Sequence, residues 1–173
     1  MRRTRFPFAN VAALLASALA TTTVLAESPG TFGPQWTADG QLQLPTGYHD
    51  WVFLGAPITP NALNGGKAAF PEYHNVYVQP QALAAYRKTG TWPEGTVMLK
   101  ELRLSQAGTK PDGSSTEPSG RGYFPAARNG IDISVKDTKR FASTNGWGFF
   151  NFGHHAPPYE MTAKAAPLES CAG

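Results

Sequence analysis

The chain has 173 residues and one cysteine, and its 15 lysines and arginines outnumber its 12 acidic residues. Three of those arginines lie within the first five residues, so the rest of the chain carries as many basic as acidic residues. This balance excludes the strongly basic surface that binds nucleic acid or anionic lipid, and the length predicts a single domain with its own core.

The first predicted element is an export signal. Its basic head, MRRTR, precedes an apolar stretch over residues 11–20 that is too short for a membrane anchor. Small side chains just before position 27 form a cleavage site, so residues 1–26 are predicted to be a secretory signal peptide. The mature domain, residues 27–173, is then expected in the periplasm without a membrane span. Ordinary export of the unfolded chain is the favoured route, with folded export through the paired arginines as the alternative.

The first half of the mature domain predicts short elements and one clear helix. Residues 48–55 form a brief apolar run that fits either a helix or a strand, and residues 61–67 carry Asn-Gly-Gly turn chemistry. The run HNVYV, residues 74–78, predicts a strand whose successive side chains face opposite sides. Residues 80–90 predict a helix, with proline near its start and glycine as its stop.

The second half predicts three further strands. Residues 97–104 show the clearest period-2 alternation, residues 131–135 alternate as well, and the aromatic run 147–152 forms the last strand. Glycines in the aromatic run indicate a bulge or the close approach of another group. Residues 106–122 are polar and rich in glycine, proline and serine, which predicts a mobile loop. Residues 154–173 are expected to run as a proline-broken loop into a short helix.

Together these elements predict a mainly β fold of the α+β class. At least four strands are separated by turns, and one good helix lies between them. We therefore expect a single domain in which an antiparallel sheet carries a few helices.

One charged side chain is out of place on the clearest strand. In GTVMLKEL, the alternation puts Lys100 on the same face as Met98 and Leu102. Burying an ammonium group is costly unless the group is paired or used. The pattern leaves two interpretations open: the lysine snorkels to water from a half-buried strand, or its amine faces a functional pocket.

The histidines and acids give weaker signals. His154 and His155 are adjacent, so on a strand they face opposite sides, and we expect loop or surface histidines rather than metal ligands. His74 shares a strand face with two valines and is expected in the core or in the wall of a pocket. Four acids show no spacing that identifies an acid–base pair: Glu72, Glu94, Glu101 and Asp132.

The single cysteine lies two residues before the end of the sequence. In an exported protein, an odd thiol indicates an intermolecular disulfide, a reactive thiol or the attachment of a cofactor. Cys171 and the two small residues after it also form the first half of C-x-x-C-H, which attaches a c-type heme through two thioethers. We expect the sequence to stop inside this motif, with the second cysteine and the axial histidine just beyond Gly173.

Four blocks of the sequence together resemble the cytochrome P-460 family: YHDWVFLGAPITPNALNGGKAAFPEYHNVYVQP, YRKTGTWPEGTVMLKEL, GIDISVKDTKRF and GWGFFNFGH. The likeness runs from about Leu44 to Cys171 and keeps the blocks in order. It implies a periplasmic, usually homodimeric cytochrome with a mostly β fold and one heme c, attached at Cys171. It further implies a covalent bond from the porphyrin edge to the lysine of GTVMLKEL, Lys100. Such a tether distorts the macrocycle and tunes its reactivity.

The resemblance also implies a function. Family members of this kind oxidise hydroxylamine at a five-coordinate heme iron and pass the electrons to another cytochrome. A carboxylate on the distal side of the heme takes up protons. Glu169 is the acid in the stretch before Cys171, and His74 is a further candidate for the distal pocket. The expected substrate is therefore a small nitrogen compound.

Two alternatives remain beside this function. Cytochromes c-prime-beta share the fold and bind nitric oxide or carbon monoxide without a lysine bond. A heme-free secreted domain of the same fold is the other alternative, and in it Cys171 is expected to form an intermolecular disulfide.

Overall fold

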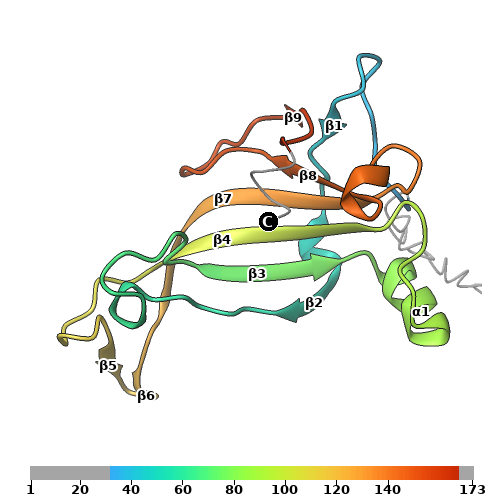
Figure 1. Cartoon of the computed structure of the whole chain (residues 1–173). Helices are drawn as coiled ribbons and strands as arrows, with labels where there is room; N and C mark the ends of the chain where they lie inside the picture. Colours follow the sequence, from blue (N-terminus) through green and yellow to red (C-terminus); the bar gives the residue numbers. More distant parts are fainter. Residues whose placement is uncertain (1–31, 168–173) are drawn as a thin grey trace, which may run out of the picture.

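The computed structural model describes residues 32–167 of the chain. The predicted signal peptide lies outside this range, as do the predicted site residues Glu169 and Cys171. The described residues form one antiparallel main sheet, two small two-stranded sheets and one α-helix (Figure 1). The prediction of a single, mainly β domain built on an antiparallel sheet is confirmed.

The main sheet has five strands in the order β2-β3-β4-β7-β8, and every neighbouring pair is antiparallel. Its central strands are the ones whose period-2 alternation is clearest in the sequence. The bounds of the five strands are β2 (Val52–Gly55), β3 (Tyr73–Val78), β4 (Val97–Ser105), β7 (Pro125–Lys136) and β8 (Trp147–Asn151).

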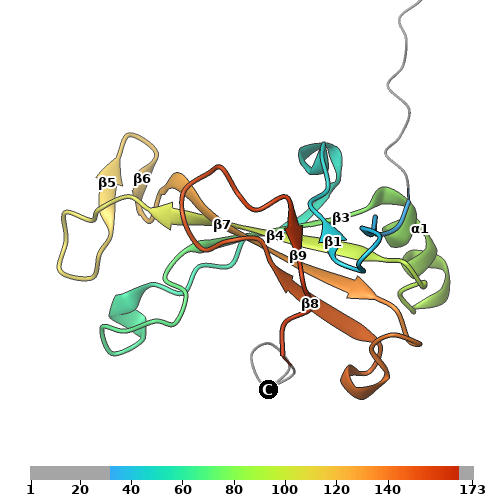
Figure 2. The same ribbon diagram turned by 90° about the horizontal axis from the view of Figure 1, so that it is seen from above.

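The smaller elements lie around this sheet. Figures 1 and 2 show a hairpin of strands β5 and β6 at one end of the sheet and the helix α1 at the other. A second small sheet pairs β1 with β9, which joins the two ends of the described chain. The bounds of these strands are β1 (Leu42–Gln43), β5 (Ser115–Glu117), β6 (Gly120–Gly122) and β9 (Thr162–Ala163).

The helical segments follow the local sequence signals. Helix α1 (Pro80–Thr89) starts with its proline and ends at Gly90, which has a left-handed φ of 72°. The segment for which the sequence left helix or strand open forms both, a 3₁₀ turn followed by β2. Three 3₁₀ turns occur in the described residues: η1 (Tyr48–Asp50), η2 (Asn61–Leu63) and η3 (Ala142–Thr144).

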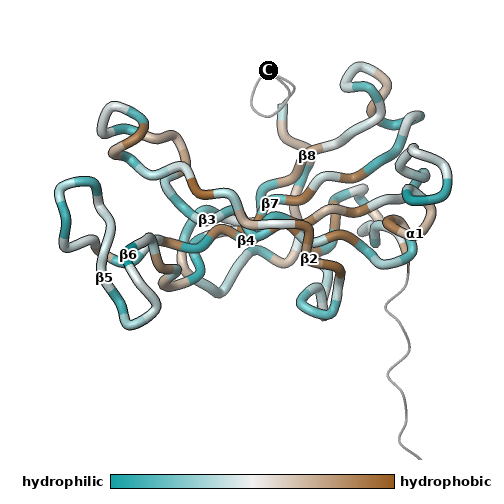
Figure 3. The backbone as a smooth tube through the Cα atoms, turned by 90° about the horizontal axis from the view of Figure 1, so that it is seen from below, coloured by the Kyte–Doolittle hydropathy of each residue, from teal (hydrophilic) through white to brown (hydrophobic). Residues whose placement is uncertain are grey.

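The two faces of the main sheet differ in burial. On one face, alternate residues of β4 and β7 are fully buried, among them Leu99 and Ile133, and pack with Phe150 of β8 into the main core. On the opposite face, Met98 and Lys100 are only half buried. Figure 3 shows the apolar segments along these strands and the hydrophilic character of the β5–β6 hairpin. The predicted alternation of β4 is therefore confirmed, and one face of the sheet stays partly open.

A glycine in β8 allows the close approach that the sequence predicted. The ring of Phe141 lies 2.3 Å from the place where a Cβ on Gly148 would stand. Only a residue without a side chain leaves room for this ring, which also packs on the main core. The prediction is confirmed for this position.

One local prediction is wrong. Residues 106–122 are not a loop throughout, because β5 and β6 pair within them. The Arg121 guanidinium donates to Asp112 and Ser114, and these charge-assisted bonds close the hairpin despite its polar composition. Residues 154–167 contain no helix and run through β9 to a β-bridge between Ala165 and Phe150. The remainder of the segment in which a short helix is expected, residues 168–173, lies outside the described residues.

Candidate functional site

Lys100 occupies the half-open face of the main sheet. In the register of the strands it lies between Val76 of β3 and Asp132 of β7. Its Nζ is 2.9 Å from Asp132 Oδ2, and the two side chains are 31% and 26% exposed. The amine is thus neither free in water nor buried alone, because a carboxylate on the next strand holds it.

Asp132 is the acid that the sequence did not single out. Its Oδ1 accepts a 2.7 Å hydrogen bond from the Asn151 amide on β8, while Oδ2 faces Lys100. Lys100, Asp132 and Asn151 are directly opposite one another across three adjacent strands. The alternation of residues 97–104 and 131–135 indicates which strand face carries Lys100 and which carries Asp132. The register that sets these two residues opposite each other cannot be read from the sequence.

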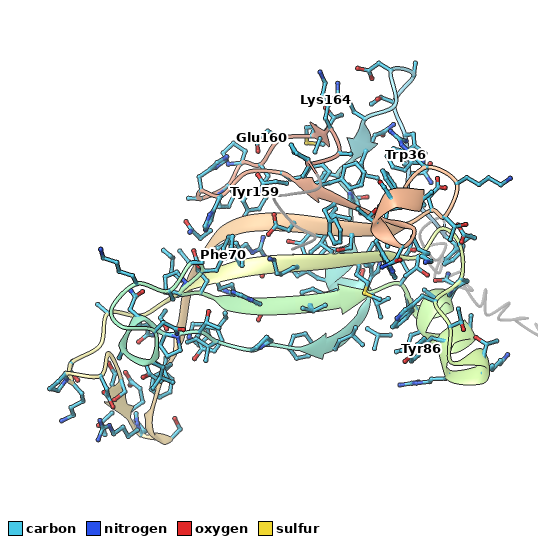
Figure 4. All side chains as sticks on the ribbon, viewed as in Figure 1. Trp36, Phe70, Tyr86, Tyr159, Glu160 and Lys164 are labelled. Atoms are coloured by element: carbon cyan, nitrogen blue, oxygen red, sulfur yellow. The ribbon has the colours of Figure 1, made fainter. Side chains whose placement is uncertain are left out.

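An aromatic ring lies beside the lysine amine. Lys100 Nζ is 5.1 Å from the centre of the Phe70 ring, which is the geometry of a cation–π contact. Phe70, labelled in Figure 4, comes from the segment before β3. Its side chain is 39% exposed. No periodicity marks Phe70, because it lies in a loop.

His74 lies next to this pair, on the neighbouring strand β3. Its ring meets Phe70 edge-on at 6.2 Å, and its Nε2 is 3.4 Å from the Phe70 carbonyl oxygen. Partial burial, together with the positive charge of Lys100, holds the pKa of His74 below its ordinary value. The imidazole is therefore neutral at neutral pH. The structure brings His74 and Lys100 together through the pairing of β3 with β4, which the sequence did not predict.

The adjacent histidines after β8 have separate partners. His154 Nε2 is 2.7 Å from Glu72 Oε1, whereas His155 contacts the Ala156 carbonyl and Glu160. Within residues 32–167 no group of three or more histidine, cysteine or acidic side chains is placed to hold a metal ion. His155 is a surface residue, and the pKa of His155 is raised by these two acceptors.

Glu101 follows Lys100 in sequence but lies on the opposite, buried face. Its Oε2 accepts from the Tyr48 hydroxyl at 2.7 Å and lies 3.2 Å from both His49 and Arg128. Burial and the bond to this carboxylate raise the pKa of Tyr48. This cluster belongs to the core side of the sheet and is separated from the Lys100 amine by the sheet itself.

The segment that leads toward Cys171 runs along the outer edge of β8. The Ala166 N–H donates a 2.7 Å hydrogen bond to the Phe149 carbonyl, so the described chain ends against the edge strand β8 of the main sheet. Cys171 lies outside the described residues.

In the part of the chain that the structure describes, no helix has the length and apolar character needed to cross a membrane.

Comparison with known protein families identifies the family of this chain. A sequence model of the cytochrome P-460 family matches residues 45–173, which includes all strands of the main sheet and Cys171. A comparison with curated proteins finds no match. Members of the matched family are heme cytochromes, and the match covers well over half of the sequence. The chain therefore belongs to the cytochrome P-460 family.

Proposed function

We propose that this protein is a periplasmic c-type heme oxidoreductase that oxidises hydroxylamine. The observation that carries the proposal is the Lys100–Asp132 pair on a half-open sheet face, in a chain of a heme cytochrome family. A primary amine and a carboxylate side by side supply the two protein groups that such a site needs, one to bind the cofactor and one to take up protons.

The residues of this face fit a heme. Val76 and Met98, beside the lysine, are only half buried by the described residues, whereas Leu102 on the same face is fully buried. Apolar side chains left partly uncovered are typical of a surface that another group covers. In this proposal Lys100 would bond one edge of the porphyrin, and Cys171 would form a thioether at another. Half-buried apolar residues of this face include Val52, Val76, Met98 and Phe149.

The cofactor supplies the redox chemistry when it is bound, and the protein residues manage the protons. The oxidation of hydroxylamine releases protons as well as electrons. Asp132 is the carboxylate next to Lys100, and Asn151 fixes its orientation. His74 is neutral for the reason given above and is a second proton acceptor at the same end of the face. We assign the proton-accepting role to Asp132 before Glu169, which lies outside the described residues.

The lysine bond is tested by intact-mass analysis of heme-loaded protein after chemical cleavage of the thioethers. The parent protein is expected to keep the mass of the heme, and Lys100→Arg is expected to lose it. Arginine retains the charge opposite Asp132 but has no primary amine. Lys136→Arg is the matched control, because Lys136 also lies close to an aromatic ring, Trp147. Loss of the heme from the parent protein would overturn the assignment of Lys100.

Catalysis is tested separately by hydroxylamine-dependent reduction of a soluble electron acceptor. Steady turnover by the heme-loaded protein supports the proposed oxidoreductase. Binding of nitric oxide or carbon monoxide without hydroxylamine turnover would instead support the second candidate, a gas-binding protein.

The family resemblance also suggests how the protein assembles and where it is located. We propose a homodimer that passes its electrons to a partner cytochrome in the periplasm. The edge strand β2 supports the dimer, because it presents exposed Phe53 and Leu54 at the border of the main sheet.

A further inference from the structure

A buried acid lies close to the lysine site without a role in the chemistry described above. Glu72 directly precedes β3 and is only 3% exposed. Its Oε1 accepts from the Asn129 amide at 2.9 Å and lies 2.7 Å from His154 Nε2. Its Oε2 is buried without a hydrogen-bond partner among the described residues. Burying a carboxylate with one oxygen unpaired costs free energy of folding. The contacts of Glu72 therefore require an explanation.

The partner of this acid contacts the aromatic ring of the site. The His154 ring stacks on Phe70 with 5.4 Å between centroids and 26° between planes. Phe70 in turn lies 5.1 Å from Lys100 Nζ. A continuous row of contacts therefore runs from Asn129 through Glu72, His154 and Phe70 to the lysine amine.

The backbone is shaped to bring His154 to this position. A Cβ on Gly130 would stand 3.3 Å from His154 Cα and 3.0 Å from the Gly153 carbonyl oxygen. The Ile131 N–H donates to that same carbonyl at 3.2 Å. The absence of a side chain at position 130 thus lets the loop after β8 lie against β7, with the histidine over the segment before β3.

Phe70 depends on such contacts for its orientation. It lies in the loop between η2 and β3, and more than a third of it is exposed, so the core does not fix its ring. The ring makes an edge contact with His74 and a stacking contact with His154. Because His154 is itself held by a buried carboxylate, it presents a fixed surface to the ring.

We propose that Glu72 and His154 are positioning residues that hold the Phe70 ring as a cap on the Lys100 end of the face. The cap sets the size of the molecules that reach this end: it admits hydroxylamine-sized compounds and excludes bulkier ones. The size selection rests on the proposed function, because it needs the heme-loaded enzyme. The contacts that hold the Phe70 ring belong to the chain alone and do not depend on heme.

The loaded protein tests the cap through binding rates of probes of graded size. Carbon monoxide and tert-butyl isocyanide are mixed with the reduced heme protein, and the ratio of their association rates is recorded. His154→Gln retains a donor for Glu72 but removes the stacking ring, and is expected to reduce the preference for carbon monoxide by about threefold. Phe70→Ala is expected to reduce it further. His155→Gln is the control and leaves the ratio unchanged, because His155 contacts only Ala156, Tyr159 and Glu160.

The chain without heme tests the same contacts independently. Lys100 is acylated with a small amine-reactive reagent, and the rate of acylation is measured by peptide mass spectrometry. This rate is expected to rise in His154→Gln and Phe70→Ala but not in His155→Gln. Circular dichroism confirms that each variant is folded, and His154→Phe, which retains the stack, is expected to protect Lys100 better than His154→Gln.

The outcomes separate the two proposals. Absence of heme together with the expected pattern of acylation overturns the proposed function and supports the cap. Binding ratios and acylation rates that change in Phe70→Ala but not in His154→Gln show that the ring acts without the pair, which overturns the positioning role.

Discussion

The ion pair between Lys100 and Asp132 orients two groups of the proposed site and contributes little to the stability of the fold. Both side chains are partly exposed, and pairs of this kind contribute at most about 1 kcal/mol to the free energy of unfolding. The geometry, with a second bond from Asn151 to the same carboxylate, fixes where each oxygen points. At the scale of single residues, the pair therefore serves to orient the Lys100 amine and the Asp132 carboxylate.

Replacement of this acid separates function from stability. In Asp132→Asn the free energy of unfolding in urea is expected to change by no more than about 1 kcal/mol. Hydroxylamine turnover is expected to fall by about 100-fold, because a proton acceptor is removed. Glu117→Gln, at an exposed acid on β5, serves as the control and leaves turnover unchanged. Unchanged turnover in Asp132→Asn would assign proton uptake to another group.

His74 gives the protein a defined pH dependence. Burial and the charge of Lys100 depress its pKa in the folded state below the ordinary value of about 6.5. The unfolded chain therefore binds the proton first as the pH falls, and this contribution to stability declines below about pH 6.5. His74→Gln is expected to flatten the fall in the free energy of unfolding between about pH 7.5 and 5.5. Parallel curves for the parent and variant would contradict this assignment.

At the scale of elements, the end of helix α1 depends on one backbone conformation. Gly90 has φ of 72°, and a Cβ there would meet nothing within 4 Å. Gly55 in β2 has the same open surroundings but no positive φ. The two glycines therefore differ in conformation and not in available space.

This pair of glycines provides a matched experiment. Gly90→Ala is expected to lower the free energy of unfolding by about 1 kcal/mol, because the left-handed conformation penalises a Cβ. Gly55→Ala is expected to change it by less than about 0.5 kcal/mol. Equal effects in thermal or urea unfolding would show that the cap conformation is not what ends the helix.

At the scale of the whole molecule, the main sheet separates a closed side from an open one. Its buried face packs the core together with Glu101 and Tyr48, while its half-open face gathers Lys100, Asp132 and Phe70. Successive residues of one strand thus serve stability and the site in alternation, because each side chain faces opposite to the last.

The proposed homodimer is tested at the sheet edge. Phe53 on β2 is 52% exposed, and its replacement by lysine puts a charge where a second copy would pair. Phe53→Lys is expected to shift the mass measured by light scattering from dimer to monomer. Leu63→Lys, at a residue that is 78% exposed in η2, is the control and keeps the parent mass. A dimer that survives in Phe53→Lys would exclude this edge as the interface.

The sequence by itself determined most strands of the main sheet, the helix and the face on which Lys100 lies. Period-2 alternation correctly predicted β3, β4 and β7, an aromatic run predicted β8, and proline and glycine bounded the helix. Alternation also showed that Lys100 shares a face with apolar residues. These features are local, because a side chain's face depends only on its place along its own strand. The predicted roles of Cys171 and Glu169 stay predictions, since both residues lie outside the described range.

Only the tertiary structure decided which groups meet at that face. Asp132 reaches Lys100 through the register of β4 with β7, and Phe70 and His154 come from two loops that contact each other across the sheet. The β5–β6 hairpin likewise depends on the bonds of Arg121. Register and loop placement arise from packing between segments distant in the chain, and periodicity within one segment carries no information about its neighbour.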